Sequence, residues 1–125
     1  MKLIKTVAKA LGPYSLFVRP PPNTKPVHFA GMIGNSPETN ELVPGGFEAQ
    51  IKQVFSNIDH TLDEAGVKKQ QIVKANVFLT DMANFQTMNK HYTEYFGNHK
   101  PARTAIAVKE LPFKALIEIE VLAYE

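Results

Sequence analysis

The segment Leu116–Tyr124 near the end of the chain carries apolar side chains on both of its faces. The two alternating sets are Ala115, Ile117, Ile119, Val121 and Ala123 on one face, and Leu116, Glu118, Glu120, Leu122 and Tyr124 on the other. Because the side chains of a strand alternate between the faces of a sheet, apolar residues in both sets require cover on both sides. The chain offers two helices for this, so the second cover must come from another subunit, and we expect an obligate oligomer.

Apolar periodicity and turn residues predict an α+β fold for the whole chain. Helical spacing predicts one helix over Phe47–Ala65, closed by Gly66, and a second helix from a cap at Asp81 to about Phe96, before Gly97. About six strands are expected, at Lys2–Val7, 14–20, Val27–Ile33, Ile72–Thr80, Arg103–Val108 and Leu116–Tyr124. This order suits a two-layer sandwich with both helices on one face of the sheet.

Length and composition exclude several classes of protein. A chain of 125 residues suits one hydrophobic core, so we expect a single domain over residues 1–125. The net charge of +2 comes from charges scattered along the chain. Nucleic-acid binders normally carry a basic face or stripe, so we expect no nucleic-acid partner. The chain has no cysteine, and its 4 histidines lack metal-ligand spacing, so no metal site is expected. No segment approaches the ~20 apolar residues of a membrane span, and we expect a soluble, cytoplasmic protein with no membrane partner.

An arginine interrupts the start of the apolar segment Pro101–Val108. If this strand pairs antiparallel with the last strand, through the short connection near Pro112, Arg103 falls opposite or diagonal to Glu118 and Glu120. One interpretation is a structural Arg–Glu pair at a sheet edge or a subunit interface. The other is a site in which the guanidinium holds a substrate carboxylate while a glutamate acts on water. Spacing alone leaves both open.

Four sequence stretches together resemble the Rid/YjgF family of reactive intermediate deaminases, formerly called L-PSP endoribonucleases. They are "GPYS" at 12–15, "VFLTDMANFQTMNKHYTEYF" at 77–96, "PARTAI" at 101–106 and "LPFKALIEIEVLA" at 111–123. The resemblance covers nearly the whole chain in the right order, including the helix at 48–66. It implies a chorismate-mutase-like fold and a homotrimer whose sheets form a central barrel with the helices outside.

The resemblance also implies an activity and a set of site residues. Active members hydrolyse 2-imino and 2-enamino acids to 2-keto acids and ammonia, without metal or organic cofactor, in clefts between neighbouring subunits. Arg103 resembles the arginine that clamps the substrate carboxylate, Glu118 the acid that positions or activates water, and Tyr14 the tyrosine lining the pocket. Asn89 resembles an asparagine near the site, and Gly31 the glycine of a Ser-Gly-Gln motif on the third strand.

The chain departs from this motif, because it has Ala30-Gly31-Met32 where the family commonly has Ser-Gly-Gln. A serine hydroxyl that would help orient substrate or water is therefore absent at Ala30. The loss of such a hydrogen bond costs about 0.5–1.5 kcal/mol. Two alternatives to the deaminase stay open, the first because of this departure and the second because of the family's older name. One is a non-catalytic regulatory trimer that binds 2-keto acids. The other is a ribonuclease or translation inhibitor, although the sequence shows no basic, aromatic-lined groove for RNA.

Overall fold

The computed structural model of the chain describes residues 8–125, and it agrees with the predicted α+β class. Within these residues the elements are β1 (Pro26–His28), α1 (Gly46–Ala65), β2 (Ile72–Leu79), α2 (Phe85–Phe96), β3 (Ala102–Ala107) and β4 (Ile117–Tyr124). Three short 3₁₀ turns lie at Lys69–Gln71, Met82–Asn84 and Pro112–Lys114. Both predicted helices are confirmed, as are the strands β2, β3 and β4.

The helix ends follow local chemistry. Gly66 ends α1 in the left-handed region, with φ 72°, and its N–H donates to carbonyl groups of the last helical turn. Asp81 accepts a hydrogen bond from the Ala83 N–H at 2.9 Å, so it caps the 3₁₀ turn that leads into α2. The α-helix itself therefore begins only at Phe85, and it ends before Gly97. Among the described residues, no helix is long and apolar enough to cross a membrane.

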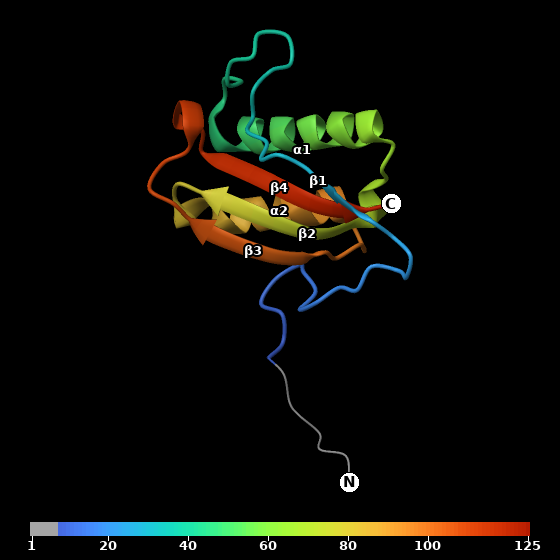
Figure 1. The fold of residues 1–125 in the computed structure, drawn as a ribbon. Coiled ribbons are helices and arrows are strands. Elements are labelled where there is room, and N and C mark those ends of the chain that lie inside the picture. The colour runs from blue at the N-terminus through green and yellow to red at the C-terminus, as the bar shows by residue number, and fades with distance from the viewer. Residues whose placement is uncertain (1–7) are drawn as a thin grey trace.

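The strand order in the sheet is β1-β4-β2-β3 (Figure 1). β4 pairs antiparallel with both β1 and β2, whereas β3 pairs parallel with β2. The predicted antiparallel pairing of the last two strands is therefore wrong, because β2 lies between them. Parallel neighbours need a crossover connection, and α2 supplies it between β2 and β3. The connection after β3 then passes over the width of β2 before β4 begins.

The N-terminal half contains fewer strands than predicted. The strand expected at Lys2–Val7 lies outside the described residues, and the segment 14–20 contributes only a bridge between Ser15 and Ala102. The third predicted strand is the three-residue β1 followed by a bridge between Met32 and Ile119. The segment after Ser15 cannot continue as an edge strand through 20–22, because three successive prolines donate no ladder hydrogen bond. Residues 8–125 therefore contain four strands, where five of the six predicted strands were expected.

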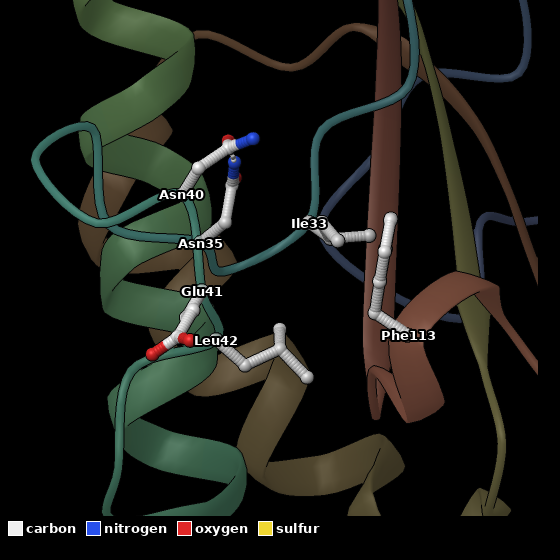
Figure 2. A pocket seen from close by; sticks show the side chains of 6 residues that line it. All are labelled: Ile33, Asn35, Asn40, Glu41, Leu42 and Phe113. Atoms are coloured by element: carbon white, nitrogen blue, oxygen red, sulfur yellow. Dashed lines mark hydrogen bonds between the residues drawn. The ribbon is translucent and has the colours of Figure 1, made fainter.

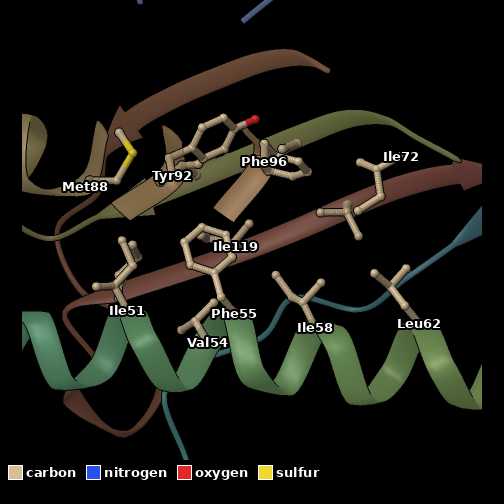
Figure 3. Packing of buried hydrophobic residues seen from close by; sticks show 14 of the residues in the cluster. Ile51, Val54, Phe55, Ile58, Leu62, Ile72, Met88, Tyr92, Phe96 and Ile119 are labelled. Atoms are coloured by element: carbon tan, nitrogen blue, oxygen red, sulfur yellow. The ribbon is translucent and has the colours of Figure 1, made fainter. Parts of the chain in front are cut away.

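The hydrophobic core lies between the sheet and the two helices, on one side of the sheet (Figure 1). Figure 3 shows the apolar side chains of α1 pointing toward the sheet and toward α2. The core members from the strands alternate along β2 and β4, and those from α1 recur at helical spacing: Ile72, Ala75, Val77, Leu79, Ile117, Ile119, Val121 and Ala123, with Ile51, Val54, Phe55, Ile58 and Leu62. Helix α2 adds Met88, Tyr92 and Phe96. The apolar helical spacing from which the sequence predicts the two helices is thereby confirmed as their core-facing side.

The other side of the sheet, called here the open face, carries no helix of residues 8–125 (Figure 1). The side chains on it mix apolar and polar groups and are partly exposed: Lys74, Asn76, Phe78, Ile106, Glu118, Glu120, Leu122 and Tyr124. Asn76 donates to Glu120 at 2.8 Å, and Lys74 donates to Thr104 at 3.1 Å. Apolar residues on an uncovered sheet face are the feature from which the sequence predicts an oligomer.

Candidate functional site

Arg103 lies on the edge strand β3, with its side chain on the helix-covered side of the sheet. Its register partner is Ala75, which is fully buried in the core, and residues in register share a face. The guanidinium Nη1 donates to Asn89 Oδ1 on α2 at 2.7 Å. In residues 8–125 no carboxylate lies within ion-pair distance of Arg103. The cation is therefore held by a neutral group and has no anionic partner from the described part of its own chain.

Three aromatic rings surround this guanidinium. Its Cζ atom lies 4.9 Å from the ring centre of Tyr92, 5.2 Å from that of Tyr14 and 5.8 Å from that of Phe85. These distances are within the range of cation–π attraction. Partial burial lowers the pKa of the Arg103 guanidinium from its ordinary value, because the charge has lost part of its water, while Tyr92 and Tyr14 oppose that change. We call Arg103, Tyr14 and Asn89 the arginine cluster.

The arginine cluster opens onto a hollow of about 250 Å³. The residues that line it are Leu11, Tyr14, Phe85, Arg103 and Ala105. The turn before Tyr14 comes close to the guanidinium, since a Cβ atom at Gly12 would lie 3.1 Å from Arg103 Nη2. The Tyr14 hydroxyl accepts from the Leu11 N–H at 3.1 Å, which holds this turn over the cation. The walls of the hollow are apolar apart from the guanidinium and Tyr14, as is usual for small-molecule sites, and the guanidinium adds a positive charge.

Glu118 lies elsewhere, on the open face of the central strand β4. It pairs in register with Phe78 of β2. Its carboxylate lies against Gly31, where a Cβ atom would come 2.9 Å from Glu118 Cδ and would overlap Oε2. Only glycine leaves this space, and Ala30 lies exposed beside it. Unlike Glu120, which accepts from Asn76, Glu118 has no side-chain hydrogen bond within residues 8–125. We call Glu118 and Gly31 the glutamate cluster.

The structure therefore brings the predicted site residues together as two groups. Arg103 and Glu118 of one chain lie on opposite faces of the sheet, with β2 between their strands. The expected position of Arg103 opposite or diagonal to Glu118 and Glu120 is wrong, because it assumed that β3 and β4 are neighbours. An Arg–Glu pair within one chain is excluded by the same geometry.

Met32, the second departure from the family motif, lies on the opposite side from Gly31. It bridges to Ile119 of β4, and its side chain packs on the hydrophobic core. It lines a shallow hollow against α1 together with Asn57 and His60. The thioether therefore affects core packing and leaves the surroundings of Glu118 unchanged.

Sequence reasoning missed several residues around the arginine. Helical spacing places Phe85, Met88 and Tyr92 on the core-facing side of α2, yet Phe85 and Tyr92 also contact the guanidinium. Met88 Sδ lies 3.8 Å from Arg103 Nη1. The signal was available, because Asn89 follows Phe85 by four residues and precedes Tyr92 by three, which places them on one face of α2.

A larger hollow, of about 420 Å³, lies away from the arginine cluster (Figure 2). Figure 2 shows Ile33 pointing toward Phe113 near the start of β4, and Asn35 donates to Asn40 at 2.8 Å across the rim. Its lining residues are Ile33, Asn35, Asn40, Glu41, Leu42 and Phe113. None of these residues was predicted to belong to the site. In the described part of the chain, no group of three or more His, Asp or Glu side chains is placed to hold a metal ion.

Comparison with known proteins assigns this architecture to a family. The family model described as Endoribonuclease L-PSP matches residues 5–125. A RutC family protein from Pyrococcus abyssi is 43% identical over 117 residues, which cover 94% of this chain and 90% of that protein. This chain belongs to the Rid/YjgF family.

Two further Rid/YjgF relatives add an activity and a solved structure. The 2-iminobutanoate/2-iminopropanoate deaminase of Bos taurus is 37% identical over 126 residues, covering 99% of this chain and 90% of the bovine protein. The crystal structure of RidA from an Antarctic Psychrobacter is 38% identical with a TM-score of 0.76, and the match covers 100% of both chains. The predicted family resemblance is confirmed, and the α+β fold of this Rid/YjgF protein agrees with that of a solved relative.

Proposed function

We propose that the protein is a hydrolase that converts 2-imino and 2-enamino acids to 2-keto acids and ammonia. The observation that carries this proposal is Arg103, a half-buried cation among aromatic rings, at a hollow, with no carboxylate partner from residues 8–125. Its planar fork matches a substrate carboxylate through two parallel hydrogen bonds. The name of the bovine relative supports the same reaction class.

The proposed reaction adds water to the carbon of the C=N bond. With the carboxylate fixed on Arg103, Glu118 positions the water and accepts its proton as the oxygen attacks the carbon. Glu118 passes that proton to the imine nitrogen, which gives a tetrahedral carbinolamine. As the C=O bond forms, the hydroxyl proton is transferred to the same nitrogen, the C–N bond breaks and ammonia leaves. General acid–base assistance of this kind contributes about 10²–10⁴-fold, and Tyr14 forms a wall of the substrate pocket. No cofactor takes part in these steps.

This reaction requires Arg103 and Glu118 to meet, so we propose that they come from two copies of the chain. In a homotrimer whose sheets form a central barrel, the open face of each copy is covered by the next, and each cleft takes its arginine cluster and its glutamate cluster from different copies. The partly exposed Phe78, Ile106 and Leu122 support this arrangement.

We further propose that residues 1–125 form one Rid domain. A cytoplasmic location stays a prediction.

The first test measures hydrolysis of 2-iminobutyrate, generated in situ from an amino acid, by wild type, Arg103→Ala and Glu118→Ala. We expect wild type to accelerate hydrolysis, and Arg103→Ala to lose about 10²-fold or more in kcat/KM, because the charged hydrogen bonds to the carboxylate disappear. Both variants should retain the oligomeric state of wild type in size-exclusion chromatography. An Arg103→Ala variant with full activity would contradict the assignment.

A subunit-mixing experiment tests where the two clusters meet. Arg103→Ala and Glu118→Ala are unfolded together and refolded as mixed oligomers. If each cleft combines an arginine and a glutamate from neighbouring copies, roughly a quarter of the clefts regain both groups, and activity returns. If both groups acted within one chain, every chain in the mixture would lack one, and no activity would return.

A second candidate function is a non-catalytic trimer that binds 2-keto acids. The observation that favours it is Ala30, which supplies no hydroxyl group beside Gly31 and Glu118. It predicts that 2-ketobutyrate raises the unfolding temperature by mass action while wild type leaves imine hydrolysis at its spontaneous rate. Strongly salt-dependent RNA binding would instead support the ribonuclease alternative.

A further inference from the structure

Helix α1 carries three amide side chains along one side. They are Gln50, Gln53 and Asn57, at positions i, i+3 and i+7, and we call them the amide stripe. Gln50 is only 7% exposed, although it is polar and lies among core residues of the helix. A buried amide is retained at little cost only where its hydrogen bonds are made, so its partners indicate what it does.

The partner of Gln50 is the backbone just before Glu118. Gln50 Oε1 accepts a hydrogen bond from the Leu116 N–H at 2.8 Å. Leu116 lies immediately before β4 and two residues before Glu118. The hydrogen bond therefore holds α1 to the N-terminal end of β4, close to Glu118.

The same helix also holds the segment that contains Gly31. Gly34 packs against the Gln50 backbone, where a Cβ atom would lie 2.7 Å from the Gln50 carbonyl oxygen. Asn57 Nδ2 donates to the carbonyl groups of Ile33 at 3.0 Å and of Asn35 at 2.9 Å. Gln53 Nε2 donates to Asn57 Oδ1 at 2.9 Å and so orients that amide. The loop is thus fastened to α1 within a few residues of Gly31.

Gly31 and Glu118 belong to these two separately held segments, and they contact each other with no room for a methyl group. We infer that the amide stripe, through Gln50 and Asn57, positions the Glu118 carboxylate over Gly31 for its action on water. The hydrogen bonds of the stripe run to the backbone at Leu116, Ile33 and Asn35, so it acts on Glu118 and Gly31 through the chain beside them. The inference rests on the proposed function, in which Glu118 is the residue that acts on water.

The test compares Gln50→Leu with Leu62→Ala, a core truncation on the same helix, at a residue 2% exposed and away from both segments. Gln50→Leu leaves the Leu116 N–H unpaired, so we expect kcat to fall about 10- to 100-fold. KM for the imine and Kd for 2-ketobutyrate should stay within about threefold, because the arginine cluster is untouched. Leu62→Ala should lower the unfolding temperature but leave kcat within about threefold of wild type.

Two more variants separate positioning from folding. Gln50→Glu keeps an oxygen that accepts from Leu116, and we expect it to restore kcat to within about threefold of wild type. Asn57→Ala releases the Ile33 and Asn35 carbonyl groups while Gln50 stays in place, so it tests the stripe even if Gln50→Leu does not fold; its kcat should fall about 10-fold. Equal kcat losses in Gln50→Leu, Asn57→Ala and Leu62→Ala would overturn the inference.

Nuclear magnetic resonance of the backbone amides provides a readout that does not depend on turnover. The Gly31 and Glu118 N–H resonances should move in Gln50→Leu and Asn57→Ala and stay in place in Leu62→Ala. Unmoved resonances in both amide variants would overturn the inference whatever the activity. If the resonances move in both amide variants but wild type does not accelerate hydrolysis, the proposed function and the catalytic role of the stripe are overturned. The structural effect of the stripe on the position of Glu118 would still stand.

Discussion

The arginine cluster and the glutamate cluster differ in how far the described chain itself completes them. Arg103 is held by a 2.7 Å hydrogen bond from Nη1 to Asn89 and by aromatic rings from α2 and the N-terminal turn. Glu118 lies on the open face with only Gly31 pressed against it. The half-buried cation has its contacts from the described part of its own chain, whereas the carboxylate on the open face has no hydrogen-bond partner there. The arginine cluster is thus formed when one chain folds, whereas we expect the glutamate cluster to be completed only when the subunits assemble.

The same small substitution at each cluster gives the sharpest contrast. Gly31→Ala places a methyl group in the space of the Glu118 carboxylate, which must swing away, so we expect activity to fall about 10- to 100-fold. Because the end of a flexible side chain yields, the free energy of unfolding should change by no more than about 1 kcal/mol. Imine hydrolysis and urea denaturation measure the two effects.

Gly12→Ala is the matched control beside the arginine cluster. Its Cβ atom would lie 3.1 Å from Arg103 Nη2, and the guanidinium needs to move only a few tenths of an ångström. We expect activity within about threefold of wild type. A larger loss in Gly12→Ala than in Gly31→Ala would reverse the comparison, and the arginine cluster would then be the less tolerant of the two.

Asn89→Ala removes the amide that orients Arg103. A hydrogen bond to a charged group contributes about 1.5–3 kcal/mol, so we expect KM for the imine to rise about tenfold with little change in kcat. Steady-state kinetics with 2-iminobutyrate measure both constants. Asn89→Asp serves as the control, because it supplies an anion that competes with the substrate carboxylate and should raise KM further. An unchanged KM in both variants would show that the aromatic rings alone orient the guanidinium.

Tyr92→Phe tests whether the ring or the hydroxyl supports the cation. The Tyr92 hydroxyl is the buried side-chain polar atom that has no hydrogen-bond partner within residues 8–125. Burial raises the pKa of Tyr92 well above its ordinary value, so the group stays neutral. Because Phe keeps the ring under Arg103 and removes an unpaired hydroxyl, we expect stability to be equal or up to about 1 kcal/mol higher. Urea denaturation measures it, and a loss above that size would indicate a partner supplied by assembly.

The smallest effect is expected from a pair outside both clusters. Glu48 on α1 contacts His91 on α2, with 3.0 Å between Oε1 and Nε2, and this hydrogen bond lowers the pKa of the Glu48 carboxyl below its ordinary value of 4.5. A lowered pKa means that the folded state favours the carboxylate, so its contribution is present above pH 4.5 and is lost as the pH falls through the lower, folded-state value.

Glu48→Gln should therefore lower the unfolding temperature at neutral pH, by no more than about 3 °C for an exposed carboxylate. The difference from wild type should disappear in strongly acidic buffer. Thermal unfolding over a pH series measures it, with Glu94→Gln as the control, because Glu94 lies 3.9 Å from the other nitrogen of the same histidine. A difference that persists in strong acid would show that the carboxylate charge is not its source.

Local signals in the sequence predicted much of the fold. The helical spacing of Phe47–Ala65, the glycines at 66 and 97 and the dense β-branched run of β2 were each confirmed, because they depend on contacts within a few residues. The segment 14–20 failed as a strand, since its alternation resembles an edge strand but the following prolines cannot extend one. In the site, the family resemblance named Arg103, Tyr14 and Asn89 as site residues, and the structure brings these three side chains together.

The sequence by itself determined the class of fold, the two helices, the faces of β4 and the identity of the charged residues. Tertiary structure decided the strand order, and with it the face on which each charge lies. The reason is that side-chain alternation fixes which residues share a face within one strand, while the neighbours of a strand depend on long-range pairing and on a crossover such as α2. Because β2 lies between β3 and β4, Arg103 and Glu118 of one chain are turned away from each other.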